Sequence, residues 1–485
     1  MIQELDTVIL VKDYPDQGLV KGDMGAVIMV HRGLGMVREW REAKVEEVCS
    51  LIVDCVNKTA PVVEGPTPYK MVRTTNIRNG RVDLSDCKYV EKETFEKWTR
   101  RAAVLDSDVL LTREAPIGEV GYVQGAETIF LGQRIMQYRA NPGVLHSRFL
   151  LYAFLSPKLR QQFGAHEGSG SVISHIRVGD CFKFQIPLPD LDEQRRIAHI
   201  LGTLDDKIEN NRKTAKTLEA MAQAIFKSWF VDFDPVRAKM AGESRESICT
   251  RLKLPPEILD LFPDRLVDSE LGEIPEGWCV GTFGDYADIV GGSTPSTNNS
   301  AYWLSGIHSW ATPKDLSSLT MPVLLATENK ITDAGLQQVS SRLLPVGTVL
   351  LSSRAPIGYL AIAEIPVAIN QGFIALKPHN NGYCIFLLFL IKHNMEEIIS
   401  RANGSTFLEI SKAKFRPIPV VSPAQGILQS FAKLTMPLFL RIVSLEKITR
   451  LLAVQRDALL PPLISGEIRI PEAQHLIQAT MERTP

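Results

Sequence analysis

The sequence predicts an α+β protein in which two β-rich modules stand in tandem and each is followed by a long helix. Short β-branched runs broken by Gly, Pro and Asn predict strands and turns over residues 37–190 and 278–421. Apolar heptads predict helices over residues 191–232 and 422–470. Matching segments in the same order indicate that the second half repeats the first.

Composition bounds the class of protein. The 485 residues suffice for two to four domains, and 45% hydrophobic with 22% charged residues predicts a globular chain with real cores. We expect no membrane span, no signal peptide and a cytoplasmic location. Seven scattered cysteines without a Cys-x-x-Cys pair predict neither a zinc site nor a disulfide framework. The net charge of −1 does not by itself indicate nucleic-acid binding.

The internal repeat is visible in five segments. "LLTREAPIGEV" begins at Leu110, and "LLSSRAPIGYL" begins 240 residues later at Leu350. "FLGQRIMQYR" aligns with "AINQGFIALK", "EWREAKVEEVCSLIVD" with "GWCVGTFGDYADIVGG", and a Pro-x-Pro pair recurs before each helix. The glycine-rich "EGSGSVISHIRVGD" precedes the first of these pairs and matches "RANGSTFLEISKAK". Because the order is kept and the offset drifts slowly, we interpret the repeat as a duplication with loop insertions.

Both predicted helices carry a heptad seam in the same phase, which favours mutual packing over two independent surface helices. The first seam contains Ile197, Leu201, Leu204, Ile208, Asn211, Ala215, Leu218, Ala222, Ile225 and Trp229. The second contains Ile427, Phe431, Leu434, Leu438, Arg441, Leu445, Ile448, Leu452, Gln455 and Leu459. Asn211 and Arg441 occupy the same seam position, where a polar residue can fix the register.

Three segments lie outside this plan. Residues 1–36 contain two β runs around "VKGDMG", which resemble part of a small SH3-like barrel and have no counterpart in the second half. Residues 233–277 form a Pro-rich connector in which we expect one short helix. Residues 471–485 form a tail.

Motifs for catalysis are missing from the sequence. "DFDP" at Asp232 lacks the second proline of an amino-methyltransferase motif, and no Gly-x-x-x-x-Gly-Lys-Ser/Thr loop occurs. The nearest Gly-rich loop, "EGSGSV" at Glu167, is interpreted as a turn. The histidines never take a metal-ligand spacing, and the helical Asp205 and Asp206 are expected to be solvated. The sequence therefore predicts a non-enzymatic protein without a bound metal or cofactor.

The string "PLPDLDEQRRIAHILGTLDDKIENNRKTAKTLEAMAQAIFKSWFVDFDP", followed by a second module that opens "LGEIPEGW", closely resembles specificity subunits of type I DNA restriction-modification systems. The resemblance covers roughly residues 37–470. The second copy departs from the pattern, since "SPAQGILQSFA" replaces the Glu-Gln segment and Leu-Asp-Asp-Lys-Ile is missing.

This resemblance implies that each β-rich module is a target-recognition domain that reads one half of a bipartite site in double-stranded DNA. By the same resemblance, the helices are expected to pair antiparallel as a coiled coil and to give the repeats a pseudo-twofold relationship. They are also expected to form a spacer and a platform for modification (methyltransferase) subunits, expected to be two, and for restriction (translocase/endonuclease) subunits. S-adenosylmethionine, ATP and Mg are expected to belong to those partners.

Polar side chains in predicted loops are the candidates for DNA contact, because Arg, Lys, Asn and Gln read base edges. For any single one, a solvated surface role or a salt bridge remains the alternative. The first module supplies Lys70, Arg73, Thr74, Asn76, Arg78, Arg113, Gln133, Arg134, His175 and Arg177. The second supplies Ser293, Thr294, Ser296, Trp310, Lys314, Arg354, Gln371, Ser405, Lys412 and Lys414.

The repeated "APIG" is interpreted as a scaffold turn, in which Pro fixes the entry and Gly permits a tight bend, with DNA contact as the alternative. Two other functions stay open. One is a non-catalytic coiled-coil assembly protein with β-rich ligand-binding heads. The other is the recognition half of a self-contained restriction-methylation enzyme.

Overall fold

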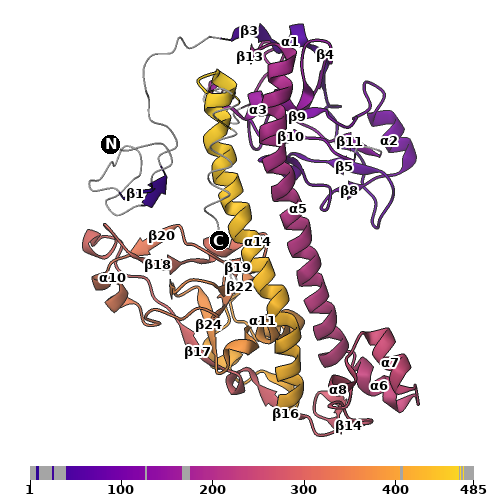
Figure 1. Cartoon of the computed structure of the whole chain (residues 1–485), viewed down its shortest axis with the longest axis vertical. Helices are drawn as coiled ribbons and strands as arrows, with labels where there is room; N and C mark the ends of the chain where they lie inside the picture. The colour runs from indigo at the N-terminus through magenta and orange to yellow at the C-terminus, as the bar shows by residue number, and fades with distance from the viewer. Residues whose placement is uncertain are drawn as a thin grey trace. The chain divides into compact units, whose positions relative to one another are not determined.

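The computed structural model describes residues 7–9, 24–26, 40–125, 128–166, 175–404, 408–468, 470 and 473. The chain divides into two units (Figure 1). The first unit comprises residues 1–208 and 451–485, and the second comprises residues 209–450. Each unit contains one β-rich module and parts of both long helices, α5 (Leu191–Phe230) and α14 (Gln425–Ser465).

The first unit is built on two main sheets. The larger has the order β4 (Cys49–Asp54), β12 (Ile135–Ala140), β9 (Val109–Thr112), β10 (Val120–Tyr122), β7 (Gly80–Val82) and β6 (Ile77–Arg78). The smaller is β11 (Ile129–Leu131), β5 (Lys70–Val72) and β8 (Lys88–Tyr89), and a separate pair joins β13 (Gln185–Leu188) to β3 (Arg41–Lys44). The helices are α1 (Val45–Val48), α2 (Lys92–Trp98), α3 (Ser147–Leu155) and α4 (Pro157–Gly164), and η2 (Thr74–Asn76) is a 3₁₀ turn.

The second unit has the corresponding parts. Its larger sheet has the order β17 (Ala287–Gly291), β24 (Phe373–Pro378), β21 (Val349–Ser353), β22 (Ile357–Ala363) and β19 (Val323–Leu324). Its smaller sheet is β20 (Asn329–Ile331), β18 (His308–Ala311) and β23 (Ala368–Ile369), and β16 (Cys279–Thr282) pairs with β25 (Pro419–Ser422). The helices are α9 (Pro313–Ser317), α10 (Asp333–Gln338), α11 (Cys384–His393), α12 (Met395–Ser400) and α13 (Lys412–Phe415).

The two modules share their strand order. The order β4-β12-β9-β10 in the first matches β17-β24-β21-β22 in the second, and β11-β5-β8 matches β23-β18-β20. In both small sheets the equivalent pair is parallel, β11 with β5 and β23 with β18. This agreement in topology is what a duplicated sequence predicts.

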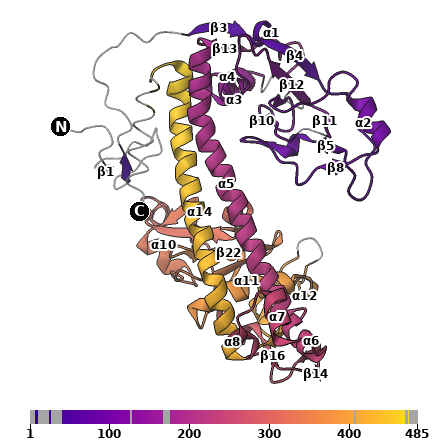
Figure 2. The ribbon, with the colours of Figure 1, turned by 45° about the vertical axis from the view of Figure 1, so that its right-hand side comes forward.

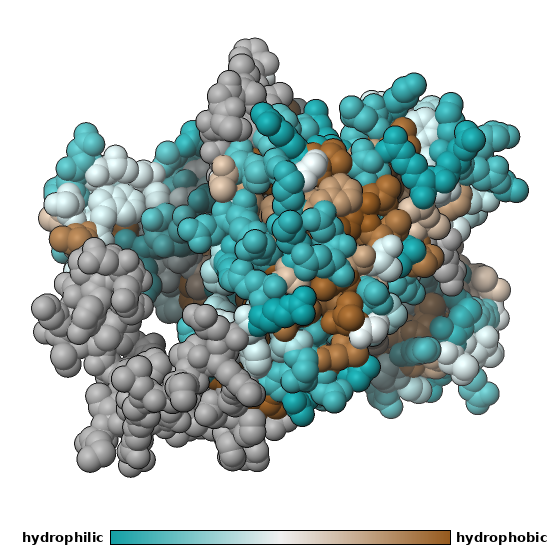
Figure 3. Space-filling view, turned by 90° about the horizontal axis from the view of Figure 1, so that it is seen from above, coloured by the Kyte–Doolittle hydropathy of each residue, from teal (hydrophilic) through white to brown (hydrophobic). Residues whose placement is uncertain are grey.

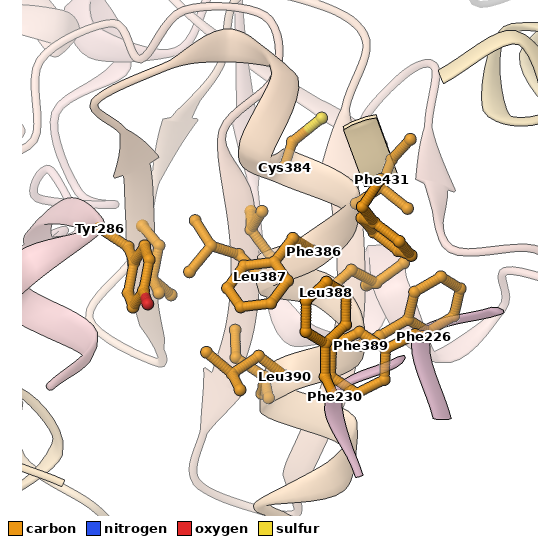
Figure 4. Close-up of a cluster of buried hydrophobic side chains, with 14 of the residues drawn as sticks. Phe226, Phe230, Tyr286, Cys384, Phe386, Leu387, Leu388, Phe389, Leu390 and Phe431 are labelled. Carbon is orange, nitrogen blue, oxygen red and sulfur yellow. The ribbon is translucent and has the colours of Figure 1, made fainter. Parts of the chain in front are cut away.

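The central strands of the large sheets are buried along their whole length. Every residue of β9 and of β21 is buried, including the polar Thr112, Ser352 and Ser353 at the strand ends, as in strands covered on both faces. The run "CIFLLFLI" forms α11, in which residues 384–391 are all buried. Figure 4 shows Phe386 of α11 facing Phe226 and Phe230 of α5 and Phe431 of α14.

The long helices pack against each other within each unit (Figures 1 and 2). In the second unit the centroids of the Phe226 and Phe431 rings lie 6.1 Å apart. The positive charge of Arg212 is also near enough to Glu446 to lower the pKa of its carboxyl. Residue numbers rise along one helix as they fall along the other, so the two run antiparallel there. Burial raises the pKa of the Glu446 carboxyl above its usual value, and the nearby Arg212 guanidinium opposes that rise.

An ion pair joins the same two helices in the first unit. Arg456 Nη1 lies 2.8 Å from Asp205 Oδ1, and the Tyr152 hydroxyl donates to Asp205 Oδ2 at 2.7 Å. Each side chain of the Arg456–Asp205 pair is only 16% exposed. The prediction that Asp205 is solvated was therefore wrong. Asp206 is more exposed but pairs with Arg148, which lowers the pKa of its carboxyl.

Burial follows the predicted seam closely in α5 and less closely in α14. Ile197, Leu201, Leu204 and Ile208 are at most 1% exposed. In α14 the predicted Arg441 is exposed and the adjacent Ile442 is buried, so Arg441 does not lie on the buried face. A straight helix drifts by about 20° per heptad relative to a 3.5-residue repeat, which moves the buried stripe to a neighbouring position.

The other predicted seam residues are either half-buried or buried. Half-buried positions are Asn211, Leu218, Ile225, Leu434, Leu438, Ile448 and Gln455. Buried positions are Ala215, Ala222, Trp229, Ile427, Phe431, Leu445, Leu452 and Leu459, and Thr435, Phe439 and Thr449 join them although the heptad pattern did not include them.

The connector is more ordered than its composition predicts. It contains α6 (Asp234–Met240), α7 (Arg245–Leu252), α8 (Pro256–Leu259) and a hairpin of β14 (Leu266–Ser269) with β15 (Gly272–Pro275). The expectation of one short helix was wrong because the prolines stand in the first turns of α6 and α8, where no backbone donor is lost. Asp234 of "DFDP" begins α6 and accepts a hydrogen bond from Ser228 at 2.7 Å.

At the ends of the chain, β1 (Thr7–Ile9) pairs with β2 (Met24–Ala26), in line with two β runs. Residues 167–174 and most of the tail lie outside the described residues.

The helix α14 contains an 18-residue window of mean hydropathy 1.2 and by length and composition could cross a membrane. Part of the apolar surface of α14 packs into the core of the second unit, where Ile427, Phe431 and Phe439 are buried.

We expect Phe431→Ala to destabilise the protein by about 3–5 kcal/mol, because it empties a ring-sized volume inside an aromatic cluster. Phe431 is fully buried against Trp229, Phe230 and Phe386. Leu440→Ala on the same helix is the matched control, since Leu440 is 55% exposed, and should cost less than about 1 kcal/mol. Chemical denaturation of both variants checks this, and equal losses would contradict the packing described.

Candidate nucleic-acid interface

The first Ala-Pro turn is held by a buried hydroxyl. Ala115–Pro116 is a cis peptide and both residues are exposed. The Thr112 hydroxyl, at the end of β9, donates to the Pro116 carbonyl at 2.6 Å and accepts from the Glu119 backbone N–H at 3.0 Å. Gly118 has φ +77°, which a residue without a side chain adopts freely.

The second Ala-Pro turn repeats this arrangement. Ala355–Pro356 is also cis and exposed. The buried Ser352 hydroxyl donates to the Pro356 carbonyl at 2.8 Å and accepts from the Tyr359 N–H at 2.8 Å. Each module thus presents an exposed turn of the same construction, whose base is fixed by its own strand. The hydroxyl clamp accords with the scaffold interpretation, and the exposed tip leaves contact with a ligand open.

Three other segments surround the first turn. The Thr74 hydroxyl donates to the Ala115 carbonyl at 3.1 Å. The Arg113 N–H donates to the Arg134 carbonyl at 2.8 Å, and Arg113 Nη1 donates to the Ile176 carbonyl at 3.1 Å. Segments 74–78, 133–134 and 175–177, which are far apart in sequence, therefore meet at the turn.

The second turn has an equivalent setting. The Ser353 N–H donates to the Gly372 carbonyl at 2.8 Å, and the Ile410 N–H donates to the Ser353 carbonyl at 3.0 Å. The Thr294 hydroxyl donates to the Gln371 side chain. Loops 291–296, 370–372 and 409–414 are thereby drawn together.

An acidic residue lies beside an arginine at each turn. Arg134 Nε is 3.1 Å from Glu114 Oε2, and Arg354 Nη1 is 3.9 Å from Glu409 Oε2. The glutamates were missed by sequence reasoning, which sought hydrogen-bond donors alone. Their position next to candidate arginines was the available signal, since carboxylates accept from cytosine amino groups and also orient arginines.

Two candidates lie inside their modules. Asn76 is buried, and its amide accepts from the Arg73 N–H at 2.8 Å and donates to the Asp86 carbonyl at 3.1 Å. Trp310 is also buried, and its Nε1 donates to the Ser293 carbonyl at 3.4 Å. Their polar atoms shape local backbone, so neither residue offers an exposed group for base contact.

Several other candidates use their polar atoms internally. Arg73 pairs with Asp86 at 3.0 Å, and Arg78 donates to the Thr74 and Ile77 carbonyls. With its amide oriented to satisfy both atoms, Gln133 accepts from the Lys58 and Thr59 N–H groups. Ser293 bridges to Gln338 and Ser340. Lys314 pairs with Glu328 at 2.8 Å, which raises its pKa, and Lys414 donates to Asn403 at 2.6 Å.

The remaining candidates differ in how exposed their side chains are. Lys70 and His175 are half-buried, Arg177, Ser296 and Lys412 are exposed, and Ser405 lies outside the described residues. Among the residues that the structure describes, no group of three potential metal ligands occurs. Hydrophilic side chains, interrupted by smaller apolar groups, cover much of the face drawn in Figure 3.

Comparison with known proteins bears on what these modules are. The family described as "Type I restriction modification DNA specificity domain" matches residues 38–220 and again residues 275–442, together more than half of the chain. A domain of unknown function matches residues 4–37.

Individual relatives have the same character. The specificity subunit of the type I restriction enzyme HindI from Haemophilus influenzae is 25% identical over 407 residues, covering 76% of this chain and 88% of that protein. The MjaIX specificity subunit from Methanocaldococcus jannaschii is 27% identical, covering 80% and 86%. A crystal structure of the type I restriction-modification S subunit from M. genitalium has a similar fold, with a TM-score of 0.51 at 18% identity over 89% of this chain and 98% of that one. The chain therefore belongs to the family of type I restriction-modification specificity subunits.

Proposed function

We propose that this chain directs a type I restriction-modification complex to a bipartite DNA site, with each β-rich module reading one half. The observation that carries the proposal is the repeated exposed turn. Two modules of the same strand order present the same clamped turn and surround it with different side chains. A shared frame with divergent surroundings suits the reading of two different half-sites.

The long helices hold the two modules at a set spacing in this proposal. An antiparallel coiled coil gives the repeats a pseudo-twofold relationship, which matches the local dyad of duplex DNA. A true dimer has to read two identical half-sites, whereas the halves of one chain can diverge. Packing of α5 against α14 in both units supports this arrangement.

Catalysis belongs to partner subunits in this proposal. The chain carries no nucleotide-binding or methyl-transfer motif in its sequence, and its net charge of −1 provides little attraction for phosphates. Two modification subunits and the restriction subunits, which use S-adenosylmethionine, ATP and Mg, supply chemistry and additional positive surface. The complex operates in the cytoplasm. Membership of the family argues against a general assembly protein with ligand-binding heads.

The first test concerns this division of labour. The purified chain should neither methylate nor cleave DNA, because it lacks the motifs for both reactions. Together with its modification subunit and S-adenosylmethionine it should direct methylation to a bipartite sequence, measured by sequencing of modified bases. Methyl transfer by the chain alone, or methylation at one uninterrupted site, would contradict the proposal. The modification subunit without this chain is the control.

The second test concerns modularity. Replacing residues 278–421 with the equivalent module of a relative should change one half of the methylated sequence and leave the other half intact, because each module carries its own sheets and turn. The reciprocal exchange of residues 37–190 should change the opposite half. If either exchange alters both halves, the modules do not read independently.

A further inference from the structure

The two turns differ in one systematic way. In the first module the residue before Ala115 is Glu114, which pairs with Arg134 from the β11–β12 connection. In the second module the residue before Ala355 is Arg354, which pairs with Glu409 from the segment preceding α13. Each turn therefore has one arginine and one glutamate at its side, but the arginine stands on the turn in only one of them.

Features shared by both modules cannot distinguish two different half-sites. The hydroxyl clamp and the Ala-Pro tip are shared, so they suit contacts to DNA that are independent of sequence. The placement of the arginine is not shared, so it can carry sequence information. This inference rests on the proposed function, namely that each module reads its own half-site.

Both arginines are accessible and only partly engaged. The Arg134 side chain is 45% exposed and that of Arg354 is 37% exposed. The contact of Arg134 with Glu114 joins Nε to Oε2 at 3.1 Å, and the two terminal nitrogens are the donors of this half-exposed side chain that a ligand would meet. The 3.9 Å separation between Arg354 and Glu409 exceeds hydrogen-bonding distance.

Two other arginines near the first turn, Arg113 and Arg73, are committed elsewhere. Arg113 donates to the Ile176 carbonyl, and Arg73 donates to both the carbonyl and the carboxylate of Asp86. Withdrawing Arg113 would leave the partly buried Ile176 carbonyl without this donor, which is costly, and withdrawing Arg73 would break two hydrogen bonds. A guanidinium whose terminal donors face a groove can present two parallel N–H groups to the O6 and N7 atoms of guanine.

We propose that Arg134 and Arg354 are the specificity-determining residues of the two modules, each contacting a guanine in its own half-site. Glu114 and Glu409 are positioning residues that hold the guanidinium groups beside the turns before DNA binds. Such pre-orientation reduces the ordering cost of the contact.

The experiment uses the complex of this chain with its modification subunit, S-adenosylmethionine and a pool of duplexes in which each position of both half-sites is varied. Arg134→Gly removes the side chain without straining the backbone, because glycine readily adopts the positive φ of +72° found at Arg134. Arg354→Ala is the counterpart. Each variant should lose preference for guanine at one position by about 10-fold or more, in opposite halves of the site.

Arg101→Ala and Arg265→Ala are matched controls. Both arginines are exposed and paired with an acid, Arg101 with Asp54 at 2.6 Å and Arg265 with Glu276 at 2.8 Å, and neither contacts a turn. They should leave the recognised sequence unchanged. Arg134→Lys and Arg354→Lys keep the charge without the bidentate fork, so they should also lose guanine preference. These lysine variants still test the proposal if Arg134→Gly or Arg354→Ala prevents the complex from assembling.

Unchanged preference in both halves would overturn the inference, as would a uniform loss over all sequences, which indicates a phosphate contact. A wild-type site without guanine in either half, or guanine preference kept by both lysine variants, would overturn it too. The proposed function survives all of these outcomes, because none of them changes whether the wild-type complex methylates a bipartite site.

Discussion

The structure depends on burying the apolar faces of the two long helices, α5 with 40 residues and α14 with 41, which neither module can cover alone. In the second unit α5 and α14 enclose an aromatic cluster with α11, and in the first unit they are joined by the Arg456–Asp205 pair. Burying a side chain of this size contributes roughly 1.5–3 kcal/mol, so a dozen such residues outweigh any exposed ion pair in the molecule. Each module is therefore anchored to the packed helices, and in the proposed function its exposed surface is available for recognition.

The polar residues between the helices have a different role from the apolar ones. A buried ion pair contributes little net stability, because desolvation offsets the attraction, but breaking one is costly. The Arg456–Asp205 pair and the partly buried Glu446 near Arg212 thus favour one register over its neighbours.

Much of the architecture could be predicted from the sequence, and the limits have physical causes. Repeats and periodicity gave the modules, the strands around the Ala-Pro turns and the long helices. The α14 stripe was placed partly wrongly at Arg441 because a heptad pattern assumes a period that a straight helix does not keep. The connector was expected to contain one short helix but contains three, two of which have a proline in the first turn, where no backbone donor is lost.

The candidate interface was harder to predict than the fold. Residue type indicated Asn76 and Trp310, whose polar atoms turn out to stabilise local backbone. Residue type also concealed Glu114 and Glu409, since their meaning comes from segments that are joined only in the folded chain. Which loops converge on a turn is a property of the strand order, and a single sequence does not reveal it.

The most direct test of the account lengthens both helices by one heptad, at positions that keep the seam in phase, and maps the methylated sites. Seven residues extend a helix by about 10 Å, which corresponds to roughly 3 base pairs of DNA. If the helices set the distance between two independent reading modules, the unread spacer grows by one to about three base pairs and both half-sites keep their sequence. A folded, active variant that still methylates the original spacing would show that the helices do not set the distance between half-sites.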